Sequence, residues 1–211
     1  MTLSLEASAA VWTPSAPARD DAPLLVLLHG YGSHEHDLVG LVPHLPRSLR
    51  SVAVRAPLTA GPGYAWVPIV DPGRPDPAVT QDAAEAVLTW LDEHVPASTP
   101  VALLGFSQGG LMVTHLLRNR PERFFAGVVL SGFTADVELP GDAALAETAP
   151  PVFFGRGDVD PVITPEAFAR TSAWLPGHTT LTEVVYPGLA HGISQQELAD
   201  VTRFLTGVLP G

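Results

Sequence analysis

The sequence predicts a single α/β domain built on a mostly parallel sheet with helices on both faces. Short apolar runs alternate with helical patterns along the chain, and no internal repeat interrupts this alternation. The run at residues 24–28 is apolar throughout, which is typical of a parallel strand covered on both faces. With 211 residues, 46% of them hydrophobic, the chain is long enough for one sizeable core and short for two. We therefore expect one domain over residues 1–211.

The N-terminal half is predicted to contain an edge strand, three further strands and two helices. Alternating apolar residues indicate the edge strand over 3–11, followed by a turn rich in Pro, Ala and Asp. The other elements are expected as strands at 24–28, 52–54 and 101–104 and as helices at 37–45 and 79–95. The segment 57–79 carries six prolines, so we expect it to lack regular structure.

The C-terminal half continues the alternation of strands and helices. Its elements are predicted as strands at 126–130, 152–154 and 181–186 and as helices at 111–118, 165–175 and 194–208. Strands that alternate with helices in this way favour βαβ units, and therefore parallel pairing.

The composition excludes several functional classes. A formal charge of −11 argues against a nucleic-acid partner and against stable association with an anionic membrane. The chain has no cysteine, which removes thiolate nucleophiles, disulfides and thiolate metal sites. Its first residues lack a basic segment followed by a long apolar one, so we expect no signal peptide and a cytoplasmic protein. The oligomeric state stays open, and a homodimer is compatible with the sequence.

Residues 105–109 form the pentapeptide Gly-Phe-Ser-Gln-Gly between a predicted strand and a predicted helix. In that context G-x-S-x-G is how an α/β-hydrolase presents its nucleophilic serine on a sharp turn. A side chain at Gly105 or Gly109 would collide with the neighbouring strand or helix, and we expect a strained Ser107 near positive φ. The pentapeptide also occurs by chance in glycine-rich chains, so its chemical meaning depends on partners elsewhere.

A general base for Ser107 is expected just after a later strand, because ligand sites in such sheets lie beyond the carboxyl ends of the strands. His191 follows the last predicted strand by a short loop and completes the chain order Ser, acid, His. Of the eight histidines, His29 is the alternative, although its place before Gly30 favours a structural hydrogen bond. We predict that His191 takes the proton of Ser107 as the serine attacks an acyl carbonyl.

Two carboxylates, Asp158 and Asp160, follow the strand predicted at 152–154. An acid at this place would accept a hydrogen bond from the second ring nitrogen of His191, fix its tautomer and stabilise the imidazolium. Spacing alone does not separate the two. Asp136 is a weaker candidate, since it also fits a solvated loop charge.

The oxyanion that forms during acyl transfer needs two positioned donors. One is the backbone N–H of Gln108, which follows the nucleophile at a helix N-terminus. The second is expected from the loop after the strand at 24–28, at the backbone N–H of Tyr31. Gly30 and Gly32 allow that loop to turn sharply enough to aim an amide at the site.

A rival interpretation places a metal ion at residues 34–37, His-Glu-His-Asp, whose H-x-H spacing resembles part of a metallohydrolase ligand set. The last acidic residue comes one position early for that pattern, and no second ligand cluster is evident. We interpret the run as a solvated loop before a helix, with Asp37 as the N-cap. The prediction is therefore no metal and no cofactor beyond water.

With these residues in place, the chain resembles the phospholipase/carboxylesterase family of α/β-hydrolases. The likeness rests on segments 28–32, 105–110, 157–162 and 186–191, which follow the family's order over nearly the whole chain. The resemblance implies Asp160 as the acid, because Ile163 and Thr164 fall where the family's Asp-x-x-Val-Pro pattern has valine and proline. It also implies that segment 63–66 borders the pocket, with Trp66 either contacting the acyl or alcohol group or serving as a packed loop aromatic.

These implications favour a serine carboxylesterase that hydrolyses small-to-medium carboxylic esters through an acyl-enzyme on Ser107. The residues after Gly32 differ from those of the thioesterase members of the family, so the substrate class stays open. Acyl thioesterase and lysophospholipase are the alternatives that use the same catalytic residues. A different class, a non-catalytic binding protein on a hydrolase scaffold, is disfavoured by the intact set Ser107, Asp160 and His191. The segment 57–79 is brief and is expected to form a pocket wall more than a lid.

Overall fold

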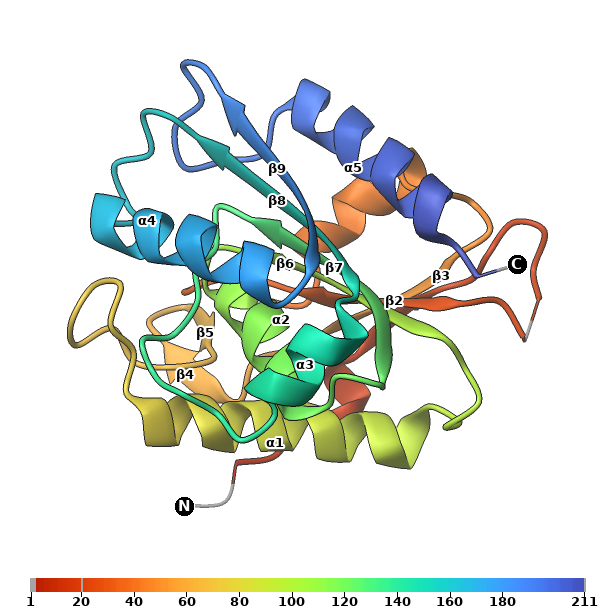
Figure 1. Ribbon diagram of the computed structural model, residues 1–211. Coiled ribbons are helices and arrows are strands. Elements are labelled where there is room, and N and C mark those ends of the chain that lie inside the picture. The colour runs from red at the N-terminus through yellow and green to blue at the C-terminus, as the bar shows by residue number, and fades with distance from the viewer. Residues whose placement is uncertain (1–2, 20, 211) are drawn as a thin grey trace.

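A computed structural model describes residues 3–19 and 21–210, so the predicted domain ends at 1 and 211 lie outside the described residues. A seven-stranded sheet has the order β1-β3-β2-β6-β7-β8-β9, and all neighbouring strands are parallel except the edge pair β1 and β3 (Figure 1). Helices lie on both faces of the sheet, which confirms the predicted α/β class. Within the described residues, no helix has both the length and the apolarity needed to span a membrane.

The strands of this sheet are β1 (Val11–Thr13), β2 (Leu24–Leu28), β3 (Arg50–Val54), β6 (Val101–Phe106), β7 (Phe124–Leu130), β8 (Pro151–Gly157) and β9 (Thr180–Tyr186). A separate antiparallel hairpin consists of β4 (Leu58–Ala60) and β5 (Gly63–Ala65). The α-helices are α1 (Pro77–His94), α2 (Gln108–Asn119), α3 (Asp142–Thr148), α4 (Pro165–Trp174) and α5 (Gln195–Val208). Short 3₁₀ helices cover Ala7–Ala9, Leu38–His44 and Leu175–Gly177.

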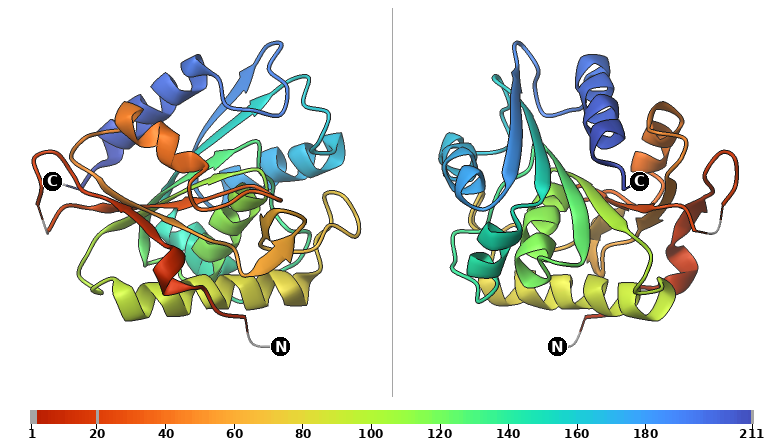
Figure 2. Two further views of the ribbon diagram at one scale, coloured as in Figure 1. Left: turned by 180° about the vertical axis from the view of Figure 1, so that it is seen from behind. Right: turned by 45° about the vertical axis from the view of Figure 1, so that its right-hand side comes forward.

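Alternation along each central strand feeds two separate hydrophobic layers. In β2, Leu24, Val26 and Leu28 face the layer that α1, α2, α3 and α4 cover. Leu25 and Leu27 face the opposite layer, covered by α5 and the 3₁₀ helix Leu38–His44. Figure 2 shows these two coverings, with α5 in blue beside the 3₁₀ helix in orange. Because both faces are buried, β2 is apolar at every position.

Three sequence predictions about elements were wrong. The first strand is only Val11–Thr13 and not 3–11, since Leu3 and Leu5 pack against the core without a strand partner. The segment 57–79 contains the β4–β5 hairpin, because its prolines fall outside the paired residues. Helix α1 begins inside that segment, at Pro77, where the missing N–H costs no hydrogen bond. Helix α3 was not predicted.

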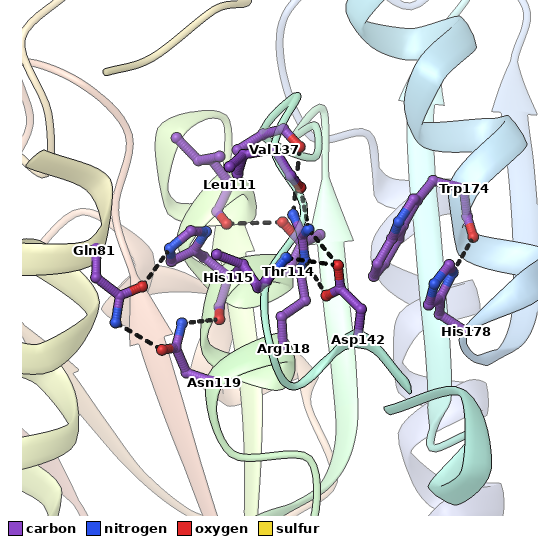
Figure 3. Close-up of polar contacts among 12 residues, drawn as sticks. Gln81, Leu111, Thr114, His115, Arg118, Asn119, Val137, Asp142, Trp174 and His178 are labelled. Carbon is purple, nitrogen blue, oxygen red and sulfur yellow. Dashed lines mark hydrogen bonds and ion pairs between the residues drawn. The ribbon is translucent and has the colours of Figure 1, made fainter. Parts of the chain in front are cut away.

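A buried arginine fixes the loop that follows β7. Arg118 on α2 makes two hydrogen bonds to the carboxylate of Asp142, at 2.7 and 2.8 Å, and others to the carbonyls of Ala135 and Val137 (Figure 3). Its guanidinium also lies over the ring of Trp174, 4.8 Å from the centroid. Burial alone would raise the pKa of Asp142, but the hydrogen bonds from Arg118 and from the Leu139 amide, together with the charge of Arg118, outweigh burial and lower that pKa.

Candidate active site

The parallel strands bring four loops together at one edge of the sheet. Tyr31 follows β2, Ser107 follows β6, Asp160 follows β8 and His191 follows β9. All four strands point the same way, so the loops after their carboxyl ends converge there. The candidate residues predicted from the sequence therefore lie together at this edge of the sheet.

Ser107 lies on a strained turn between β6 and α2. Its backbone has φ 56° and ψ −117°, a conformation that L-residues adopt only at a cost. A Cβ on Gly105 would collide with the carbonyl of Gly109, and one on Gly109 would collide with the carbonyl of Leu28. The expected strain and the need for both glycines are thus seen directly.

A continuous chain of hydrogen bonds joins Asp160, His191 and Ser107. His191 Nδ1 lies 2.8 Å from Asp160 Oδ2, and its Nε2 lies 2.9 Å from Ser107 Oγ. The Asp160 side chain is fully buried, and its other oxygen accepts the N–H groups of Val162 and Ile163. An ionised carboxylate only accepts hydrogen bonds, so Nδ1 carries the proton and Nε2 is free to accept from the serine hydroxyl.

The other candidate residues lie in structural positions. Asp158 Oδ1 accepts the backbone N–H of Gly188 at 2.6 Å and ties the two loops together. Asp136 lines a different surface hollow. The buried ring of His29 donates from Nδ1 to the Gly30 carbonyl, while Nε2 accepts the N–H of Ala56. Burial lowers the pKa of His29, so the neutral ring braces the loop that precedes Tyr31.

Two residues that line the same cavity as Ser107 have backbone amides without a protein acceptor in the part of the chain that the structure describes. Within the described residues, neither the N–H of Tyr31 nor that of Gln108 donates to another group. An unpaired amide at the first position of a helix is a ready donor to an anion. These are the two amides that the sequence predicted for the oxyanion.

The loop that carries Tyr31 is held by backbone pairing to strand β5. The N–H of Gly32 donates to the Tyr64 carbonyl at 2.8 Å, and the N–H of Tyr64 donates to the Ser33 carbonyl at 2.7 Å. A Cβ on Gly63 would collide with the backbone of Gly32, so glycine is required for this close approach. Segment 63–66 thus positions the Tyr31 loop.

Gln108 joins the serine turn to the same segment. Its side-chain Oε1 accepts the N–H groups of Trp66 and Val67, at 2.7 and 3.3 Å, and its Nε2 donates to the Val67 carbonyl at 2.7 Å. Trp66 itself is fully buried, donates its indole N–H to the His29 carbonyl and does not line the cavity. The expected substrate contact at Trp66 is therefore wrong, because the ring packs beneath the site as the alternative had it.

One residue of the run at 34–37, the buried Glu35, forms an ion pair with Arg55. Arg55 donates to both oxygens of Glu35, at 2.6 and 2.7 Å, and these hydrogen bonds hold the pKa of Glu35 down to about 2. The interpretation of the whole run as a solvated loop was thus wrong for Glu35, whose partner is distant in sequence. Among the described residues, no group of three or more His, Cys, Asp or Glu side chains is arranged to hold a metal ion.

A cavity of about 410 Å³ opens onto Ser107 and His191. Its walls are largely apolar and come from four segments: the Tyr31 loop, residues 67–75 of the proline-rich segment, and the residues that follow β7 and β8. Val67, Phe133 and Ile163 form buried parts of the wall. Sequence reasoning placed the proline-rich segment at the pocket but missed the carboxylates that line it, Asp37 and Asp71.

The topology, the strained serine and its hydrogen-bonded histidine define the class of α/β-hydrolases. The family model "Phospholipase/Carboxylesterase" matches residues 8–209, and the chain belongs to this family. It is a carboxylic-ester hydrolase.

Similar proteins agree with this assignment. Acyl-protein thioesterase 1 of Debaryomyces hansenii is 29% identical over 72% of each chain, and that of Kluyveromyces lactis is 26% identical over 94% of this chain and 96% of its own. The crystal structure of esterase PE8 is similar with a TM-score of 0.80 and 27% identity, over 99% of this chain and 100% of that one. The Bacillus cereus carboxylesterase shares the fold, with a TM-score of 0.83 at 16% identity over 95% and 94% of the two chains.

Proposed function

We propose that the chain is one catalytic domain that hydrolyses small-to-medium carboxylic esters through an acyl-enzyme on Ser107. The observation that carries the proposal is the hydrogen-bonded chain from Asp160 through His191 to Ser107, at 2.8 and 2.9 Å. In the first half-reaction Ser107 Oγ attacks the acyl carbonyl while His191 Nε2 takes its proton. His191 then gives that proton to the leaving alkoxide, and Asp160 stabilises the imidazolium between the two steps.

The amides of Tyr31 and Gln108 donate to the oxyanion of the tetrahedral intermediate. Each such donor contributes about 3 kcal/mol to lowering the barrier, because it is oriented before the charge develops. In the second half-reaction His191 activates a water molecule, which releases the acid and restores Ser107. The apolar cavity supplies room for the acyl chain, within the range of volumes typical of small-molecule sites.

The primary experiment measures hydrolysis of p-nitrophenyl esters from acetate to palmitate. We expect turnover that Ser107→Ala abolishes, an optimum at short to medium chains, and covalent labelling of Ser107 by a fluorophosphonate. A folded enzyme that is neither labelled nor active on any ester would reject the mechanism and leave a binding protein. A lysophospholipid and a thioester with the same acyl chain, run in parallel, compare the alternative substrate classes.

Asp160 and Asp158 offer a matched pair of variants. Asp160→Asn should lower kcat by about 10⁴-fold, since an amide no longer holds the histidine in its active tautomer. Asp158→Asn keeps an acceptor for the Gly188 amide and should change kcat by less than about threefold. Equal losses in the two variants would contradict the assignment of the acid.

A further inference from the structure

The cavity carries negative charge where it opens to solvent. Asp37 and Asp71 line it, and both residues are exposed. Asp37 accepts the Ser33 hydroxyl at 2.7 Å, and within the described residues neither carboxylate forms an ion pair. Asp160 adds a third carboxylate one hydrogen bond behind His191. The site therefore has three carboxylates near the position of the reacting ester.

Within the described residues, no arginine forms an ion pair with Asp37 or Asp71. All 11 basic residues of the chain are arginines, and none lines the cavity among the residues that the structure describes. Arg55 is committed to Glu35 and Glu6. Arg170 lies behind the wall and donates to the carbonyls of Gly73 and Thr134. Arg74 belongs to the wall segment but is not part of the lining.

The two ends of a bound ester would meet different surroundings. Val67 is 2% exposed, and Phe133 and Ile163 are each 7% exposed, so the buried part of the cavity is apolar and suits an acyl chain. The leaving alcohol would then lie toward the exposed carboxylates. Near the protein surface, these carboxylates would repel an anionic alcohol group and attract a cationic one, and salt weakens both effects.

We propose that this enzyme selects esters by the charge of the alcohol, favouring cationic and neutral leaving groups and discriminating against anionic ones. The proposal rests on the function proposed above, with Ser107 as the nucleophile. The reaction is ordinary hydrolysis: water supplies hydroxide to the acyl carbon and a proton to the leaving alkoxide. The carboxylates Asp37 and Asp71 act only on the charge of the group that leaves. Alcohols bearing phosphate or sulfonate are therefore poor substrates, and quaternary amino alcohols are good ones.

The test uses three butanoate esters of similar shape whose alcohols differ in charge. These are the choline ester, its uncharged carbon isostere 3,3-dimethylbutyl butanoate, and the 2-sulfonatoethyl ester. Released butanoic acid is titrated in a pH-stat at pH 7.5, and each kcat/KM is divided by the rate of alkaline hydrolysis of the same ester. We expect the order cationic, neutral, anionic, with at least about a tenfold span at low salt. The span should shrink in 0.5 M NaCl.

Variants assign the effect to its residues. Asp37→Asn and Asp71→Asn should each reduce the ratio of cationic to anionic kcat/KM about threefold, and the double variant should reduce it further. Glu93→Gln is the matched control, since Glu93 is exposed near the far end of the 18-residue helix α1, about 25 Å from the cavity end of that helix. It should leave the ratio unchanged.

The outcomes separate this proposal from the one on which it rests. Absence of hydrolysis of all three esters, together with unlabelled Ser107, would reject the proposed function itself. Hydrolysis of all three with equal normalised rates would overturn the charge selection and leave the esterase intact. A charge order that persists unchanged in the Asp37 and Asp71 double variant would also overturn it, because the discrimination would then arise elsewhere.

Discussion

Glu197 is a buried carboxyl group whose ionisation should weaken the fold. It lies on the first turn of α5 with no exposed surface, and its Oε1 has no hydrogen-bond partner within the described residues. That oxygen lies against the backbone of Gly155 on β8, where even a Cβ would collide with it. Burial raises the pKa of Glu197 from 4.5 to about 7, although the Ser194 amide opposes the shift and Asp200 adds to it.

The sign and size of the effect follow from the two pKa values. The folded protein holds the Glu197 proton more tightly than the unfolded chain, so stability is full below about pH 4.5 and is lost as the pH rises through about 7. The difference between 4.5 and 7 corresponds to about 3 kcal/mol at alkaline pH. Glu197→Gln has nearly the same shape and cannot ionise. It should match the wild type near pH 4.5 and exceed its unfolding free energy by about 2 to 3 kcal/mol at pH 8.5.

Urea unfolding of both proteins at pH 4.5, 5.5, 7 and 8.5 measures this difference. Other titrating groups, such as the buried His29, occur in both proteins and cancel when the two free energies are subtracted. Glu93→Gln, which removes an exposed carboxylate, should show no such trend. A difference between wild type and Glu197→Gln that does not change with pH, or that grows toward acid, would refute the reasoning.

Three further predictions concern helix α2. Arg118→Met should lower the unfolding free energy in urea by about 3 to 5 kcal/mol, because Asp142 and two loop carbonyls lose their partner. Burial, assisted by the charge of Arg118, lowers the pKa of His115 to about 4, so stability that is present above pH 6.5 is lost as the pH falls toward 4. His115→Gln should therefore flatten the acid side of the stability curve; an unchanged slope would contradict the buried neutral ring. Gln108→Met should lower kcat/KM for p-nitrophenyl butanoate about tenfold while the protein stays folded, since Val67 loses its anchor.

The sheet and the hydrogen-bonded chain at its edge could be predicted because their signals are local. Continuous apolar runs marked the central strands β2 and β6, and each candidate residue follows a predicted strand. The rule that parallel strands end on one edge then brings Ser107 and His191 together without any knowledge of the intervening loops. Asp160 needed more than local spacing, since Asp158 precedes it by two residues and is used instead to tie Gly188.

What escaped prediction depends on contacts between segments that are distant in sequence. Glu35 gave no local sign of burial, because its partner Arg55 comes 20 residues later in the sequence, just after strand β3. Trp66 could not be assigned to packing, since its indole partner is a backbone carbonyl at His29. The β4–β5 hairpin was obscured by prolines that flank its paired residues, and its pairing to Ser33 has no signature in composition.

The contacts of the Gln108 side chain have a consequence for how this enzyme could change its substrates. All three of its hydrogen bonds end on main-chain atoms of Trp66 and Val67, so they do not depend on which side chains follow. The side chains of residues 68–72, which precede the positive-φ Gly73, can therefore be exchanged to reshape the cavity while the amide of Gln108 stays in place beside Ser107. Libraries for new specificities should vary that stretch and keep Gln108 and Gly63. Replacing Gln108 would loosen the turn at Ser107, and replacing Gly63 would displace the loop that carries Tyr31.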